Sequence, residues 1–224
     1  MKNHFFISML AAAALLGGLT ACNGKLDKAP RADQVPENAV RITASIGNPF
    51  TATRSMPLGT EEEQGKFNVG DEIFVRTASS QRATYHFDGT AWVPKEGEYL
   101  LWKEDMEHFD AYYPAESGEN PYVFPTDQSS TEKIAKADLM SVELDQAKTK
   151  EALHFTMYRE TTRLIVEIAG FKSEFPGDAK VENVRFHNKS NASAPQRTYI
   201  PYAKGEGKTG STYTVLIPDA NLVF

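Results

Sequence analysis

Hydrophobic and polar residues alternate along most of the chain, in short runs that end at Gly, Pro or Asp-Gly. The clearest run spans residues 40–46, where every second position is apolar. Strict alternation of this kind predicts a half-buried β-strand with one face in a core and one face in solvent. The apolar positions of this run are Val40, Ile42, Ala44 and Ile46.

Further runs between residues 67 and 114 are rich in aromatic and β-branched residues. Tight-turn residues separate them, and Asp88-Gly89 is the strongest of these turn signals. Short aromatic runs joined by such turns predict a β-meander of antiparallel strands. The runs are Phe67–Arg76, Ala83–Pro94, Tyr99–Trp102 and His108–Pro114.

The alternation returns after residue 150, at intervals typical of an antiparallel sandwich. A charged stretch at 145–150 predicts a boundary between one domain at 40–150 and another at 151–224. A complete seven-stranded sandwich needs about 100 residues, so the second domain is short. Either it is incomplete, or it lacks strands that another chain can supply. Its expected strands are Leu153–Met157, Arg163–Ile168, Val181–His187, Thr198–Tyr202 and Thr212–Ile217.

The N-terminus has a different pattern. Basic residues precede an apolar run at 5–16, and Leu-Thr-Ala then leads to Cys22. The run is too short for a mature membrane span, so residues 1–21 are predicted to be an export signal. The ending resembles the lipobox of bacterial lipoproteins, in which the cysteine is lipidated and becomes the first mature residue. Residues 22–39, with Pro30 and Pro36, predict a flexible tether.

Cys22 is the only cysteine, so an internal disulfide is excluded. Acyl chains explain this residue better, because each buried methylene contributes about 0.8 kcal/mol and two chains anchor a protein stably.

The chain has 30 acidic and 24 basic residues and a net charge of −6. An acidic balance argues against a nucleic-acid partner, whose readers carry basic patches.

No catalytic or metal-binding pattern stands out. None of the five histidines forms a short spaced pair with another His or Cys, so no zinc site is predicted. A Gly-x-Ser-x-Gly motif is absent, and lipidation would occupy Cys22, so no nucleophile is indicated. The acidic run at 61–63 predicts a solvated loop. We therefore expect no enzymatic activity, no cofactor and no metal.

Taken together and in this order, the elements resemble the fimbrillin family, which comprises pilin-like cell-surface lipoproteins of Gram-negative anaerobes. The resemblance begins with the lipobox at Cys22 and continues with the strand at 40–46, Thr53-Arg54 and the run at 67–73. Its remaining parts are Tyr85–Trp92, His108–Pro114, Asp138–Met140 and Leu153–Ile168.

The resemblance implies an all-β fold of two transthyretin-like antiparallel β-sandwich domains, anchored in the outer membrane by palmitate-type acyl chains on Cys22. In polymerising members, a trypsin-like protease cuts after an arginine near the first strand, and a strand of another subunit fills the groove. If this chain is processed in the same way, the resemblance implies that Val40–Ile46 is the displaced strand and that Arg54 is the cut site. The implied function is a pilus subunit or anchor in adhesion, which partners other pilin subunits or its own copies by strand exchange.

A second hypothesis is a monomeric surface lipoprotein that binds a glycan or a protein. Its ligand platform would be Trp92, Trp102 or Tyr112, although such aromatic residues more often fill a sandwich core. Exposed tryptophans would favour this binding module, whereas a groove beneath a removable first strand would favour the pilin. A cell-surface hydrolase is a third hypothesis, for which no particular pair of acids is indicated.

Overall fold

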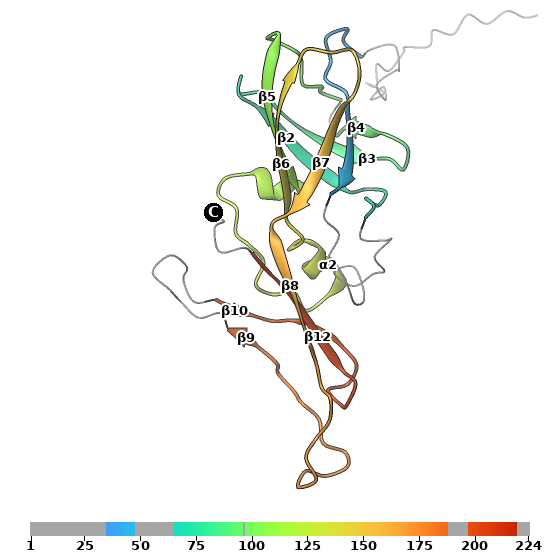
Figure 1. Ribbon diagram of the computed structural model, residues 1–224, viewed down its shortest axis with the longest axis vertical. Helices are drawn as coiled ribbons and strands as arrows, with labels where there is room; N and C mark the ends of the chain where they lie inside the picture. Colours follow the sequence, from blue (N-terminus) through green and yellow to red (C-terminus); the bar gives the residue numbers. More distant parts are fainter. Residues whose placement is uncertain (1–34, 48–64, 96, 188–196, 219–224) are drawn as a thin grey trace, which may run out of the picture. The chain divides into compact units, whose positions relative to one another are not determined.

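The structure is a computed structural model that describes residues 35–47, 65–95, 97–187 and 197–218. This part of the chain is nearly all β, as the alternating pattern predicts (Figure 1). Two short helical turns interrupt the strands: the 3₁₀ turn η2, Ala115–Gly118, and the helix α2, Thr131–Ala135. Cys22 and Arg54 both lie outside the described residues.

Seven strands form the large sheet, in the order β1-β7-β6-β5-β2-β3-β4 (Figure 1). The pairs from β7 to β4 are antiparallel, whereas β1 pairs parallel with β7. The sequence predicted an antiparallel sheet throughout. No tight hairpin joins β1 to β7, so nothing local imposes antiparallel order on this pair. The strands are β1 Ile42–Ile46, β2 Glu72–Thr77, β3 Arg82–Phe87, β4 Trp92–Pro94, β5 Met106–Tyr113, β6 Met140–Ala147 and β7 Leu153–Arg159.

One face of the large sheet forms the main core. The residues on this face take every second position of their strands, as the period of a β-strand requires. Two aromatic contacts run through it, Trp102 to Phe109 and Phe109 to Phe155, with ring centroids 5.4 and 6.3 Å apart. Offset edge-to-face contacts of this kind stabilise a core beyond the burial of their area. The fully buried side chains of the core include Val40, Ile73, Tyr85, Leu100, Phe109, Phe155 and Met157.

The segment before β1 connects the two ends of this sheet. The amide of Val40 donates to the carbonyl of Leu100 at 2.7 Å, and the amide of Trp102 donates to the carbonyl of Asn38 at 2.9 Å. Residues 100–102 follow β4, the last strand in the sheet order, whereas β1 is the first. Residues 38–40 therefore bond to the segment that follows β4, while residues 42–46 pair with β7 at the other end of the strand order.

The remaining strands form two small sheets. Strands β11, β12 and β8 make a three-stranded antiparallel sheet in that order, and β9 pairs with β10. The predicted strands at 181–187 and 198–202 are shorter than expected. Asn183 has a positive φ of 54°, which breaks the extended backbone before β9, and Ile200 instead bridges to Asp127. The bounds are β8 Thr161–Glu167, β9 Phe186–His187, β10 Thr198–Tyr199, β11 Tyr202–Lys204 and β12 Thr212–Pro218.

A second, smaller core packs against β12. It contains Phe124, Ile134 of α2, Tyr199 and both Val215 and Leu216 of β12. Its polar link is Gln128, which is fully buried. The side-chain amide of Gln128 donates to the Leu216 carbonyl at 2.8 Å and accepts from the Leu216 amide at 2.7 Å. It thereby replaces a neighbouring strand at this position and leaves neither backbone group unsatisfied.

A buried ion pair fixes the end of the large sheet. The guanidinium of Arg159, at the end of β7, bonds the carboxylate of Asp138 through Nε at 2.8 Å and Nη2 at 3.1 Å. Burial raises the pKa of Asp138, and the bonds from Arg159 oppose that rise. Strand β7 ends at this pair and β8 begins two residues later. The expected division into domains at residue 150 stays a prediction.

We expect Arg159→Met to destabilise the fold strongly, because it removes the guanidinium that bonds both oxygens of the buried Asp138 carboxylate. Loss of one partner of a buried ion pair costs about 3–5 kcal/mol. The same substitution at Lys95, whose ion pair with Glu72 is exposed, should cost about 0–1 kcal/mol. Urea unfolding followed by circular dichroism measures both values, and equal losses for the two variants would contradict this role of Arg159.

Candidate functional site

Strand β1 presents the alternation that the sequence predicts. Val40 and Ile42 are 1% and 4% exposed, and Ala44 and Ile46 are partly buried against the same core. On the outer face, the hydroxyls of Thr43 and Ser45 lie 3.0 and 2.9 Å from the two ring nitrogens of His154. The structure thus places all four apolar residues of the predicted displaced strand on the core side.

β1 is an edge strand with one neighbour. Its register with β7 places Ile42 beside Leu153, Ala44 beside Phe155 and Ile46 beside Met157. Within the described ranges, no strand pairs with the other edge of residues 42–46. Its main-chain pairing is therefore one-sided, and the packing of its apolar side chains against the core adds to its attachment.

Beneath the start of β1 lies a buried tyrosine. The hydroxyl of Tyr85 donates to the carbonyl of Val40 at 3.1 Å and accepts from the amide of Leu100 at 3.3 Å. Burial raises the pKa of Tyr85, so the phenol keeps its proton. Removal of β1 would uncover an apolar groove and would leave this hydroxyl without its acceptor.

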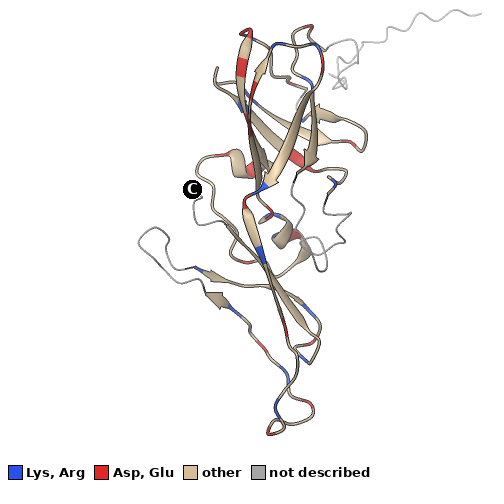
Figure 2. Ribbon diagram, in the orientation of Figure 1, with Lys and Arg blue, Asp and Glu red and all other residues tan. Residues whose placement is uncertain are grey.

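The three-stranded sheet has an apolar edge. Strand β8 pairs with β12 alone among the described strands. Leu164, Ile165 and Val166 of β8 are 38%, 37% and 40% exposed, and because neighbouring residues alternate, both faces of the strand are uncovered. The strand carries one basic and one acidic residue, Arg163 and Glu167 (Figure 2), and the three residues between them are apolar. An exposed apolar edge strand is a template for pairing with another strand.

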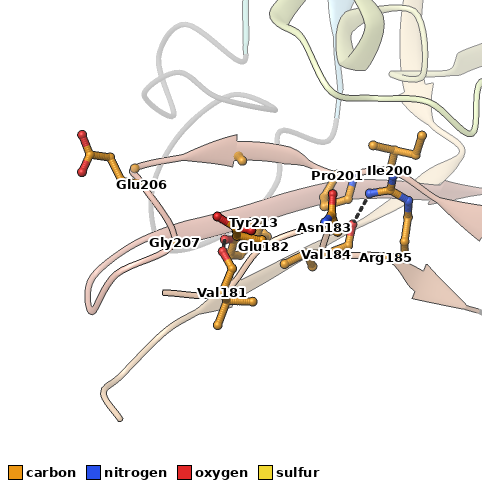
Figure 3. Close-up of a pocket in the computed structure, with 12 residues that line it drawn as sticks. Val181, Glu182, Asn183, Val184, Arg185, Ile200, Pro201, Glu206, Gly207 and Tyr213 are labelled. Atoms are coloured by element: carbon orange, nitrogen blue, oxygen red, sulfur yellow. Dashed lines mark hydrogen bonds between the residues drawn. The ribbon is translucent and has the colours of Figure 1, made fainter. Parts of the chain in front are cut away.

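A hollow of about 440 Å³ lies beside the other edge of this sheet (Figure 3). The segment 181–185 forms one wall, and the β11–β12 hairpin forms the other. The amide of Val181 donates to the carbonyl of Gly207 at 2.8 Å. A Cβ at Gly207 would lie 2.1 Å from the Val181 carbonyl oxygen, so this close approach requires glycine. The two acids that line the hollow pair with lysines two residues away in sequence: Glu182 with Lys180, and Glu206 with Lys208.

A row of charged side chains crosses the outer face of the large sheet. The ring of His108 lies 2.7 Å from a carboxylate oxygen of Asp145 and 3.2 Å from one of Asp110. Arg76 bonds the other oxygen of Asp110 at 2.7 Å. The bond to Asp145 is the main reason that the pKa of His108 is raised. No pattern in the sequence indicates this row, because its members meet only through the register of β2, β5 and β6.

The same row contains the one group of possible metal ligands found among the described residues. Ligand atoms of His108, Asp110 and Glu143 lie within 4.8 Å of one another. Asp110, however, already accepts from Arg76 and His108, and a cation would lie beside the Arg76 guanidinium. The arrangement is that of an ion-pair row.

The two tryptophans are core residues. Trp92 and Trp102 are 7% and 4% exposed, so the hypothesis that either forms an exposed ligand platform is wrong. Trp92 contacts the rings of Phe67 and Phe87, and Trp102 contacts the ring of Phe109. Tyr112, the third candidate, is half-buried on the outer face and lines a cleft there.

The chain matches one family model and is similar to several solved structures. A family model described as fimbrillin-like matches residues 55–221. A solved structure of a candidate cell adhesion protein from Bacteroides uniformis is 14% identical, with a TM-score of 0.51, over 84% of this chain and 76% of that one. Another candidate cell adhesion protein, from Bacteroides ovatus, is 14% identical over 82% of this chain and 78% of that one, with a TM-score of 0.49. No curated protein matches the sequence.

We expect Asp145→Asn to lower the pKa of His108 towards its ordinary value of 6.5. The ion pair stabilises the folded state fully below pH of about 6.5, and this stabilisation is lost as the pH rises through the raised pKa. NMR titration of the His108 ring measures the change. Asp105→Asn, which removes a nearby exposed carboxylate, serves as the matched control. An unchanged titration in the Asp145 variant would show that the pairing is absent in solution.

Proposed function

Because the chain belongs to the fimbrillin-like family, we propose that it is a lipid-anchored pilus subunit or anchor that assembles by strand exchange. The family is structural, so the protein is a non-catalytic, fimbrial-type protein of cell adhesion at the cell surface. Two structurally similar proteins are themselves candidate cell adhesion proteins. The described residues include no helix of the length and hydrophobicity needed to cross a membrane.

The observation that carries the proposal is the one-sided attachment of β1. An incoming strand can form the same main-chain hydrogen bonds to β7, and side-chain pockets select its residues. The pockets are those that now hold Val40 and Ile42. Such an exchange restores the buried area and the acceptor of Tyr85, so a vacated groove is unstable until another strand fills it.

Arg54 is the proposed cut site, and it lies in the connection between β1 and β2. Cleavage after Arg54 separates β1 from the rest of the chain, so the strand is then held by non-covalent contacts alone. Arg41 is a poorer site because its carbonyl accepts from the Leu153 amide at 2.8 Å within the paired region. Cleavage after Arg31, before the strand, would leave β1 attached. The proposed processing enzyme is a trypsin-like protease.

The partners in this account are other pilin subunits or further copies of the same chain. The uncovered edge of β8 and the hollow beside β11 support this part of the proposal, because each offers backbone or apolar surface to an added strand. Acyl chains on Cys22 would hold the first subunit in the outer membrane.

We expect Arg54→Gln to block both strand release and polymerisation. The wild-type chain, treated with a trypsin-like protease, should lose the fragment that contains β1 and form a ladder of oligomers on denaturing gels run without boiling. Arg54→Gln should keep the fragment and stay monomeric under the same treatment.

Arg31→Gln is the matched control and should behave as the wild type, because that site does not release β1. Polymerisation of Arg54→Gln would show that the cut lies elsewhere. If the wild type releases the fragment and still yields only monomers, strand exchange is wrong.

We also expect Cys22→Ser to abolish incorporation of labelled palmitate and to move the protein out of the membrane fraction. Without a thiol, no thioether or acyl anchor can form. Metabolic labelling followed by fractionation measures both effects, and Ser8→Ala is a control within the leader. Membrane retention of the Cys22 variant would contradict the lipid anchor.

A further inference from the structure

A cleft of about 250 Å³ lies on the outer face of the large sheet, away from the core side that β1 covers. Its floor comes from Arg76 of β2, Tyr112 of β5 and Ser141 of β6, and register places Tyr112 beside Ser141. Asn120 and Tyr122, from the segment after η2, form one wall. Glu160, between β7 and β8, is at the other side.

Three charged residues line this cleft, Arg76, Glu119 and Glu160, and two of them, Arg76 and Glu160, have polar partners. Nε of Arg76 bonds Asp110 at 2.7 Å, and Nη2 donates to the Tyr112 hydroxyl at 2.9 Å. The same guanidinium lies over the Tyr112 ring, 5.2 Å from its centroid. The Ser141 hydroxyl donates to the Glu160 carboxylate at 2.8 Å. A strongly charged ligand would have to compete with these pairs, whereas a neutral ligand leaves them intact.

The paired groups still offer both donors and acceptors. A guanidinium has five N–H donors, and a carboxylate has about four lone-pair sites, so Arg76 and Glu160 each keep unused capacity. The Tyr112 hydroxyl accepts from Arg76 and can therefore donate its own proton. Two phenol rings add apolar surface beside these polar groups. Paired polar groups next to aromatic surface match a pyranose ring, which has an apolar C–H face and a rim of hydroxyls.

We propose that this cleft binds one neutral hexose residue of a glycan. Its volume lies below the range of about 300–1,000 Å³ that suits drug-sized ligands, which favours a single sugar unit. The arrangement holds the Tyr112 ring in place through Arg76 before the ligand arrives, which reduces the entropy lost on binding. This inference rests on the adhesion part of the proposed function and is independent of strand exchange.

Saturation-transfer difference NMR on the full, unprocessed chain tests the inference with methyl β-galactoside, methyl β-glucoside and N-acetylglucosamine. We expect transfer to at least one of these neutral sugars. Tyr112→Ala should weaken binding at least about tenfold, because it removes the ring and releases Arg76. Tyr112→Phe keeps the ring and should weaken binding less. Phe175→Ala, which removes an exposed ring elsewhere, should leave it unchanged.

Glu160→Gln is the second variant, because it keeps the size of the side chain and should fold even if Tyr112→Ala does not. It should weaken binding by removing a charged acceptor. The inference is wrong if none of the neutral sugars binds, if binding persists unchanged in the Tyr112 and Glu160 variants, or if only 3′-sialyllactose, the anionic probe, binds. Since the unprocessed chain is monomeric in this account, failure here leaves the polymerisation assay unaffected.

Discussion

Strand β1 is held by hydrogen bonds along one edge and by the burial of one face, and both attachments are needed to close the large sheet. Through the ladder to β7 and the bonds of residues 38–40 to 100–102, a single segment contacts both the first strand pair of the sheet and the chain that follows β4. The buried Tyr85 hydroxyl depends on the Val40 carbonyl of that segment. The core is therefore complete only while this strand, or one like it, is in place.

This constraint separates two surfaces with different roles. In the proposed assembly, a whole strand is exchanged on the core side of the large sheet, where its contacts are main-chain hydrogen bonds and apolar pockets that select its residues. The outer side carries side-chain chemistry, namely the row of His108 and Asp145 and the cleft at Tyr112. The cleft at Tyr112 is lined by residues of β2, β5 and β6 and contains no residue of β1, so in the proposed assembly it is kept when β1 is exchanged.

Period-two alternation predicted which residues of β1 face the core, and it predicted an all-β chain. It did not predict the parallel pairing with β7, because the partner of an edge strand depends on contacts distant in sequence. The alternating pattern did not predict the outer cleft either, because Arg76, Ser141 and Glu160 become neighbours only through the order of the strands. Tyr112 was identified as an aromatic candidate, whereas burial rules out the tryptophans. At 181–187 the predicted strand was too long because the positive φ of Asn183 is not visible in an alternating pattern.

A reversible covalent lock on β1 tests the central claim most directly. In a Cys22→Ser background, Ser45→Cys and Thr156→Cys place two thiols at paired positions of β1 and β7, where neighbouring strands suit disulfide geometry. After cleavage by a trypsin-like protease, the oxidised protein should stay monomeric, and reduction of the same sample should start polymerisation. Polymerisation at the same rate in the oxidised and reduced states would show that β1 never has to leave.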